Sequence, residues 1–153
     1  MIIRAATNKD REQIVELVLK GLSEFDFDYA KNSSEADLED IEASYTNAGG
    51  LFLIFENGSS VMATGALKNE GEGLFKIRKM YVSNSYRGQG YGRQMLEELI
   101  REAGRRNARK IILETSYKME AAIGLYHSYG FKTVKGPIES PRCDIRMELE
   151  YSV

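Results

Sequence analysis

A glycine-rich segment at residues 87–92 constrains the fold of this chain more than any other stretch; it consists of Arg87, Gly88, Gln89, Gly90, Tyr91 and Gly92. The apolar run before it, at residues 76–82, predicts a strand, and the pattern after it predicts a helix that begins near Tyr91. Glycines allow the backbone to approach a ligand that a Cβ would obstruct. A helix that begins at this point directs unpaired N–H groups toward that ligand. The segment therefore predicts a cradle for an anion, most simply a phosphate, to which Arg87 adds a positive charge.

Two other glycine-rich motifs fit this segment less well. A P-loop ends in Gly-Lys-Ser or Gly-Lys-Thr, whereas Arg93 and Gln94 follow Gly92. A Rossmann fingerprint needs a third glycine where Arg93 stands, although Glu114 ends a later strand at about the distance expected of a ribose-binding acid. A turn that only tightens a strand–helix junction is a structural alternative.

The order of the predicted elements describes one domain, residues 1–153, of mixed α/β architecture. Turn signals at residues 57–58 and 70–73 make residues 51–82 an antiparallel meander of three strands. A Rossmann fingerprint normally follows the first strand of its domain, so a meander before the glycines counts against that motif. The expected elements are, in order, a strand at 1–6, a helix from Thr7 or Asn8, a second helix from Ser33 or Ser34 to Gly49, strands at 51–56, 61–68 and 74–82, a helix at 91–106, a strand at 110–115, a helix at 119–129, and strands at 131–134 and 144–151.

Charge and cysteine content exclude several classes of function. The formal net charge of −2 argues against a general nucleic-acid partner, because such binding requires a basic face. Cys143 is the only cysteine and His127 the only histidine, so we expect no intrachain disulfide and no metal site, and a cytoplasmic location is the simplest inference. The N-terminus lacks a long apolar segment, which predicts neither a signal peptide nor a membrane span.

The spacing Arg-x-x-Gly-x-Gly at residues 87–92 resembles the pyrophosphate-binding signature of the GNAT superfamily, the acyl-CoA-dependent N-acyltransferases. Three further stretches resemble that family in the same order: Met80-Tyr81-Val82 its central strand, Leu113-Glu114-Thr115 the end of the next strand, and residues 122–131 its Ala-x-x-Leu-Tyr-x-x-x-Gly-Phe stretch. The order of elements is similar to the GNAT fold over essentially the whole chain. The resemblance implies a mixed α/β sheet with splayed central strands and helices on both faces.

The resemblance also implies acetyl-CoA as the acyl donor and an amine that attacks it directly, without a covalent enzyme intermediate. The pyrophosphate would bind the amides of residues 88–92, and the pantetheine arm would pair with the strand edge at residues 80–82. The Val82 N–H would stabilise the oxyanion, and Tyr126 would protonate the departing thiolate or hydrogen-bond to its sulfur. Taken alone, Tyr126 is more typical of a core aromatic residue, and the Leu-Tyr-x-x-x-Gly-Phe context is what favours the acid role. The residues implied to bind the donor are Met80, Tyr81, Val82, Arg87, Gly88, Gln89, Gly90, Tyr91, Gly92 and Tyr126.

Two positions depart from the family pattern. Met119 stands at the start of a helix where many members have an asparagine that touches the pantetheine. Lys76 stands six residues before Val82, where members that use a strand carboxylate as general base have glutamate. Lysine carries its proton at neutral pH and is a poor base there. Water, Glu114, Glu72 or no residue at all are the alternatives for the base.

The acceptor is less constrained than the donor. Lys76 and Arg78 share one strand face, which favours an acceptor with a carboxylate or phosphate if that face opens to the acceptor. Solvated charges on a strand flank are the alternative. The segments at 23–32 and 136–142 are the expected acceptor loops. The resemblance implies an N-acetyltransferase acting on a small molecule or peptide amine; the alternative is a catalytically silent CoA-binding or sensor domain. The C-terminal strand, ending in Tyr151, offers an edge for a homodimer.

Overall fold

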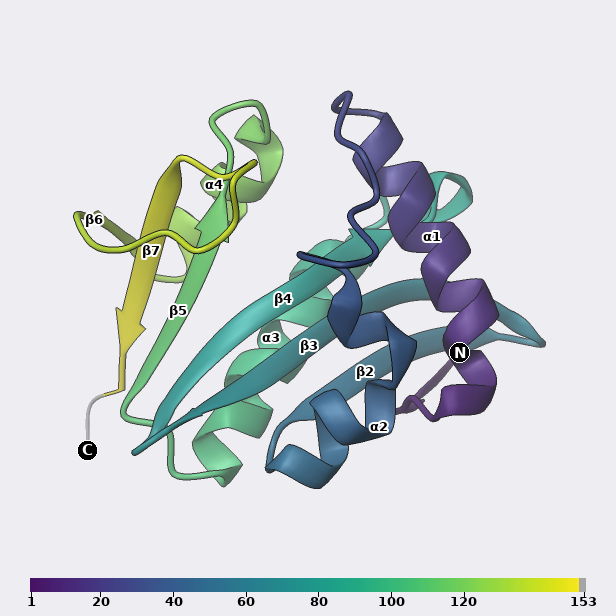
Figure 1. Ribbon diagram of the computed structural model, residues 1–153, viewed down its shortest axis with the longest axis horizontal. Helices are drawn as coiled ribbons and strands as arrows, with labels where there is room; N and C mark the ends of the chain where they lie inside the picture. The colour runs from purple at the N-terminus through teal and green to yellow at the C-terminus, as the bar shows by residue number, and fades with distance from the viewer. Residues whose placement is uncertain (152–153) are drawn as a thin grey trace.

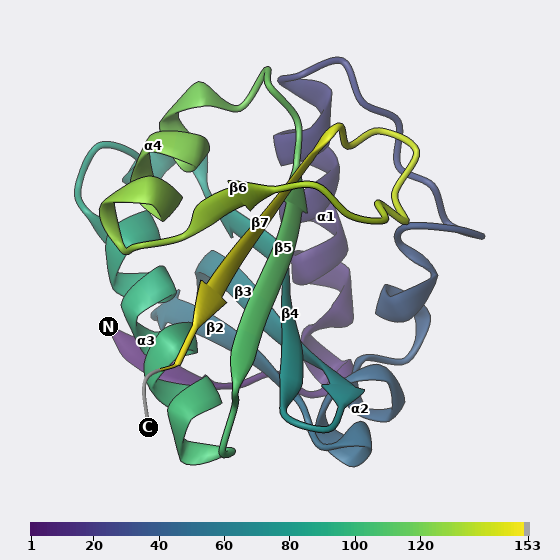
Figure 2. The same cartoon turned by 90° about the vertical axis from the view of Figure 1, so that its left-hand side faces the viewer.

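The computed structural model describes residues 1–151; residues 152 and 153, the end of the predicted domain, lie outside the described part. Its strands form one seven-stranded sheet in the order β1-β2-β3-β4-β5-β7-β6 (Figures 1 and 2). The strands are β1 (Ile2–Ala5), β2 (Leu51–Asn57), β3 (Ser60–Gly71), β4 (Leu74–Val82), β5 (Lys110–Thr115), β6 (Lys132–Val134) and β7 (Ile145–Glu150). Neighbouring strands from β1 to β4 are antiparallel, which confirms the predicted meander.

Helices cover both faces of the sheet. They are α1 (Arg11–Ser23), α2 (Ile41–Ser44), α3 (Tyr91–Arg105) and α4 (Glu120–Ser128). Figure 2 shows α3 and α4 on one side of the sheet and α1 and α2 on the other. Each pair buries its own apolar cluster, one around Met95, Leu99 and Tyr126, the other around Ile14, Val18 and Ile41. No helix within residues 1–151 has the length and apolar character needed to cross a lipid bilayer.

The second predicted helix is wrong in extent. Residues 36–48 form two short 3-10 turns, Ala36–Glu39 and Thr46–Ala48, with only the single-turn α2 between them. Asp40 interrupts the helix because its backbone is extended and its carboxylate accepts a hydrogen bond from the Ala43 N–H at 3.0 Å. Short acidic side chains compete in this way with the helical hydrogen-bond ladder.

The two central strands part from each other, as the resemblance implied. β4 and β5 are parallel and pair only where residues 74–76 face residues 110–112. Beyond Lys76 the strands diverge, which Figure 1 shows as a widening gap between them. The edge of β4 from Ile77 to Val82 therefore faces an opening and has no neighbouring strand on that side. This opening is the feature that positions the site.

A β-bulge bends β4 beside the opening. Thr64 faces Tyr81 and Ala66 faces Arg78, so Lys79 and Met80 together oppose a single residue of β3. Lys79 has a φ of 56°, which is uncommon for a residue with a side chain, and its carbonyl accepts a hydrogen bond from Thr64 Oγ1 at 2.6 Å.

The C-terminal strand is partly covered on the edge that a homodimer was expected to use. β7 pairs with β5 along residues 145–150 and with β6 along residues 146–148. Both edges of its centre are therefore occupied within the chain, and pairing of its ends across a homodimer stays a prediction.

Candidate functional site

The glycine turn leads directly into α3 and leaves amides without acceptors. Gly88 and Gly90 have φ values of 73° and 87°, and an added Cβ at either would meet no atom within 4 Å. The first hydrogen bond of the helix runs from the Gln94 N–H to the Gly90 carbonyl at 3.0 Å. The N–H groups of residues 91–93 precede this bond and have no acceptor inside the helix. Open space, a left-handed backbone and a helix N-terminus thus coincide at the predicted cradle.

Arg87 lies differently from what its position in the motif indicated. Its guanidinium forms an ion pair with Glu24, the residue that follows α1, and its Nε donates to the Val82 carbonyl at 3.1 Å. The charge of Arg87 is therefore already balanced by a carboxylate. Glu24 was not predicted to take part, because its 63-residue separation from Arg87 carries no local sequence signal.

The free edge of β4 presents the Val82 amide to the opening. The Ser83 N–H donates to the Met62 carbonyl of β3 at 2.8 Å. Because N–H groups along a strand alternate in direction, the Val82 N–H points away from β3 and toward the gap before β5. An added Cβ at Gly92 would lie 3.8 Å from Val82 Cγ2 and 4.0 Å from Leu125 Cδ2. The start of α3, the end of β4 and α4 therefore meet at one place.

Tyr126 reaches β4 from α4, next to Met80. Its side chain is 7% exposed, its ring packs on Phe131, and its hydroxyl lies 3.9 Å from the Met80 sulfur. Burial raises the pKa of Tyr126 to about 12, with a smaller contribution from the Cys143 thiol. Tyr126 thus belongs to the core and also lines a cavity, so the two interpretations of this residue are compatible.

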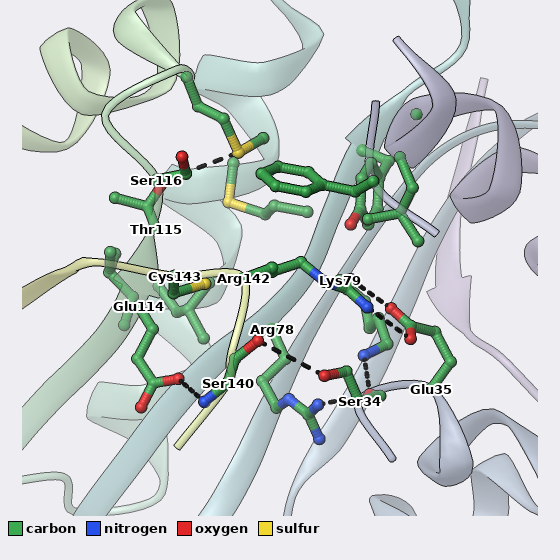
Figure 3. A pocket seen from close by; sticks show the side chains of 18 of the residues that line it. Ser34, Glu35, Arg78, Lys79, Glu114, Thr115, Ser116, Ser140, Arg142 and Cys143 are labelled. Carbon is green, nitrogen blue, oxygen red and sulfur yellow. Dashed lines mark hydrogen bonds and ion pairs between the residues drawn. The ribbon is translucent and has the colours of Figure 1, made fainter. Parts of the chain in front are cut away.

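A cavity of about 340 Å³ lies where β4 and β5 part (Figure 3). Both loops expected to shape an acceptor site contribute to its wall, the first through Phe25 and Phe27 and the second through Glu139 and Ser140. Five cationic and three acidic side chains line it: Lys68, Lys76, Arg78, Lys79 and Arg142, with Glu35, Glu114 and Glu139. Two further acids, Asp37 and Glu70, pair with lining cations from behind the wall, so the charges around the cavity balance.

Lys76 is buried, so the expectation of a solvated strand flank is wrong. Its residue exposure is 6%, and its ammonium lies 3.2 Å from Glu114 Oε2. Glu114 also accepts the backbone N–H groups of Glu139 and Ser140 at 2.7 and 3.0 Å. Burial alone would raise the pKa of Glu114, but these amides and Lys76 outweigh it and lower the pKa. Glu114 is a poor base for this reason. Glu72 lies in the turn between β3 and β4 and does not line the cavity.

A cluster of paired charges in the cavity wall was not predicted. Arg78 and Lys79 both donate to the Ser34 carbonyl at 2.7 Å, and both lie 3.3 Å from the carboxylate of Asp37, which also accepts from the Tyr45 hydroxyl. Burial lowers the pKa of Lys79 to about 8. The bulge at Lys79 turns two consecutive cations to the same side of β4, an outcome that a strict two-residue period does not allow.

A second unpredicted pair joins the two acceptor loops. Glu35 is 0% exposed, and its two carboxylate oxygens receive the Arg142 guanidinium at 2.6 and 2.9 Å. The Ala30 N–H also donates to Glu35 at 2.9 Å, and Arg142 donates to the Asp28 carbonyl at 3.2 Å. The Phe27 ring lies 5.9 Å from the same guanidinium. This bidentate pair fixes the loop after α1 against the loop before β7.

Two smaller expectations concern α4 and metals. Met119 lies directly before α4, lines the cavity and accepts a hydrogen bond from Thr115 Oγ1 at 3.7 Å, which places it where its motif position indicated. Within the part of the chain that the structure describes, no three His, Cys, Asp or Glu side chains gather as metal ligands.

Comparison with known proteins agrees with this arrangement. A family model described as the acetyltransferase (GNAT) family matches residues 17–131. The chain is 32% identical over 110 residues to "Probable N-acetyltransferase family 8 member 5" of Mus musculus, a match that covers 69% of this chain and 48% of that protein. The chain spans about half the length of the rodent relatives that it matches.

Solved structures show the same fold. An acetyltransferase of the GNAT family from Staphylococcus aureus Mu50 has a TM-score of 0.90 at 24% identity and covers 97% of this chain and 98% of its own. The PaiA N-acetyltransferase from Thermoplasma acidophilum, solved in complex with coenzyme A, has a TM-score of 0.79 at 20% identity, with 98% of both chains covered. The family model extends over more than half of the sequence, and the chain belongs to the GNAT family of acetyltransferases.

Proposed function

We propose that this protein transfers the acetyl group of acetyl-CoA to a primary amine of a small molecule or a peptide. One observation carries the proposal: the free edge of β4 runs from the unpaired amides at the start of α3 into a cavity that contains Tyr126. Acetyl-CoA consists of a diphosphate, an extended arm with two amides and a thioester. These three parts need the three features in the same order. The coenzyme A in the structure of the Thermoplasma acidophilum relative supports the choice of donor.

In this proposal each group has one task. The amides of residues 88–92 hold the pyrophosphate, and the edge of β4 at residues 80–82 pairs with the pantetheine amides. The neutral amine attacks the thioester carbon, and the Val82 N–H donates to the oxygen on which negative charge develops. When the carbon–sulfur bond breaks, Tyr126 gives its proton to the thiolate; the attacking amine loses a proton to water, and water returns a proton to Tyr126. In this proposal the acceptor amine bears an anionic group. The protein acts in the cytoplasm, and the reaction uses no metal ion.

Replacement of the acid tests this mechanism most directly. The Tyr126→Phe variant keeps the ring that packs on Phe131 and removes only the hydroxyl. We expect kcat to fall at least about tenfold, because the thiolate must then leave without a proton donor. The dissociation constant of coenzyme A should change less than about twofold. Steady-state kinetics and calorimetric titration measure the two quantities, and an unchanged kcat would remove Tyr126 from the mechanism.

The pH dependence of the reaction follows from the buried phenol. Tyr126, with a pKa raised to about 12, stays protonated far above neutral pH and remains an acid there. The acceptor amine loses its proton as the pH rises, so kcat/KM should increase up to about pH 10 without a falling limb. The Tyr126→Phe variant should show the same shape at a lower rate. A falling limb below pH 10 that is absent from the variant would contradict the assignment.

Measuring the release of coenzyme A distinguishes acetyl transfer from catalytically silent binding of the donor. The wild-type protein is mixed with acetyl-CoA and a panel of amines, and free thiol is measured. Acetyl-CoA should also protect the protein against thermal unfolding, whereas NAD(H) should not. Protection by acetyl-CoA without thiol release on any amine would favour the silent CoA-binding alternative, for which the lysine at position 76 is the supporting feature. Protection by NAD(H) alone would favour a dinucleotide-binding function.

A further inference from the structure

Among the cations of the cavity, Lys76 is the one best placed to bind a ligand. Arg78 and Lys79 are both held by Asp37 and the Ser34 carbonyl, and the guanidinium of Arg142 is occupied by Glu35. The ion pairs and hydrogen bonds of these three cations hold loops in place. Lys68 is more exposed and lies 3.7 Å from Glu70.

The position of Lys76 in the sheet directs its ammonium into the site. Lys76 faces Ile112 in the last pair between β4 and β5, so it stands where the two strands begin to part. Its neighbours Phe75 and Ile77 belong to the core on the α3 side, which places Lys76 on the opposite face, beneath the acceptor loops. The opening beyond this pair is the one in which the thioester lies in the proposed mechanism.

The partners of Lys76 leave part of its hydrogen-bonding capacity free. Its ammonium faces two carboxylates, Glu114 at 3.2 Å and Glu139 at 3.7 Å. Glu114 already accepts two backbone amides, and the side chain of Glu139 is 69% exposed. An ammonium has three donor hydrogens, and Glu114 can satisfy only part of them. An incoming anion can displace the exposed Glu139 without leaving any buried group unpaired.

We propose that Lys76 binds a carboxylate of the acceptor, so that the substrate is an amine bearing a carboxylate elsewhere in the same molecule. This inference rests on the proposed acetyl transfer and adds the substrate class and the residue that selects it. A single ammonium balances the one negative charge of a carboxylate, whereas a phosphate dianion would keep a second charge without a partner.

The test compares amines that differ only in this charge. γ-Aminobutyrate, ε-aminocaproate and glycine are each assayed against the corresponding amide, with rates expressed per neutral amine. The wild-type protein should prefer the acid in at least one pair by about tenfold or more in kcat/KM, the effect expected of a charge-assisted hydrogen bond in a largely buried site. Lys76→Met should reduce this preference to less than about twofold, and Lys76→Arg should retain it.

Lys68→Met is the matched control, because it removes a cation from the same cavity wall directly across the β3–β4 pair from Lys76. Its preference for the acid should equal that of the wild type. Protection of each variant by coenzyme A against thermal unfolding shows that it is folded. Turnover without preference for the acid, or a preference that survives Lys76→Met, overturns this inference alone. Absence of turnover on every amine, with acetyl-CoA still bound, overturns the proposed function instead.

Discussion

The Gly90→Val variant is expected to bind coenzyme A at least about 100-fold more weakly than the wild-type protein, because it should lose two or more charge-assisted hydrogen bonds. Gly90 precedes α3 with a φ of 87°, a conformation that valine adopts only with strain. Relief of the strain would rotate the amides of the turn away from the pyrophosphate. A side chain that kept the turn in place would instead occupy the open space that the pyrophosphate requires.

Gly71→Val is the control for backbone strain. Gly71 has a φ of 92°, and an added Cβ there would also meet no atom within 4 Å, but it ends β3 and pairs with Leu74 of β4. Both variants should lose a similar free energy of unfolding, on the order of 1–2 kcal/mol. Only Gly90→Val should lose coenzyme A affinity in a calorimetric titration. Equal affinities in the two variants would show that the turn does not hold the pyrophosphate.

The Glu35→Ala variant is expected to lose roughly 3–5 kcal/mol of its free energy of unfolding, the cost of leaving one member of a buried ion pair without its partner. Glu35 is fully buried, and its carboxylate accepts hydrogen bonds from the Arg142 guanidinium and from the Ala30 N–H. Urea unfolding followed by circular dichroism measures the loss. The surface pair of Glu16 and Lys20 is the control, and Glu16→Ala should cost less than about 1 kcal/mol.

Two further measurements separate charge from packing at this pair. Glu35→Ala combined with Arg142→Met removes both charges and should recover part of the lost stability, because no buried charge then stays unpaired. Where the single variant is folded, the KM for the amine should rise while the KM for acetyl-CoA stays the same, since the pair joins the acceptor loops and does not touch the glycine turn. A loss of stability as small as that of Glu16→Ala would contradict the role of the pair.

Local patterns were sufficient for most of the fold. Turn residues between the strands predicted the meander, and the apolar spacing of residues 91–106 predicted α3. Such signals act between residues that are close in sequence. The glycine turn was also predictable, since φ values near 73° and 87° select glycine. The second helix was predicted too long because Asp40, which looks like any acidic residue of a first helical turn, is extended.

The arrangement of charges around the cavity depended on tertiary structure. Glu24 meets Arg87 across 63 residues, and Glu35 meets Arg142 across 107, and neither separation has a signature in the sequence. The bulge at Lys79 arises from pairing with β3, and it turns Arg78 and Lys79 to one side. Lys76 was recognisable as a departure from a motif, but its burial and its ion pair with Glu114 were not.

The sequence by itself thus determined the glycine turn and the helix that follows it, because the geometry of a short backbone motif is encoded by adjacent residues. Only the tertiary structure decided which charged side chains pair with one another. The physical reason is that ion pairing depends on distances between loops, and these distances are set when the sheet and its helices pack together.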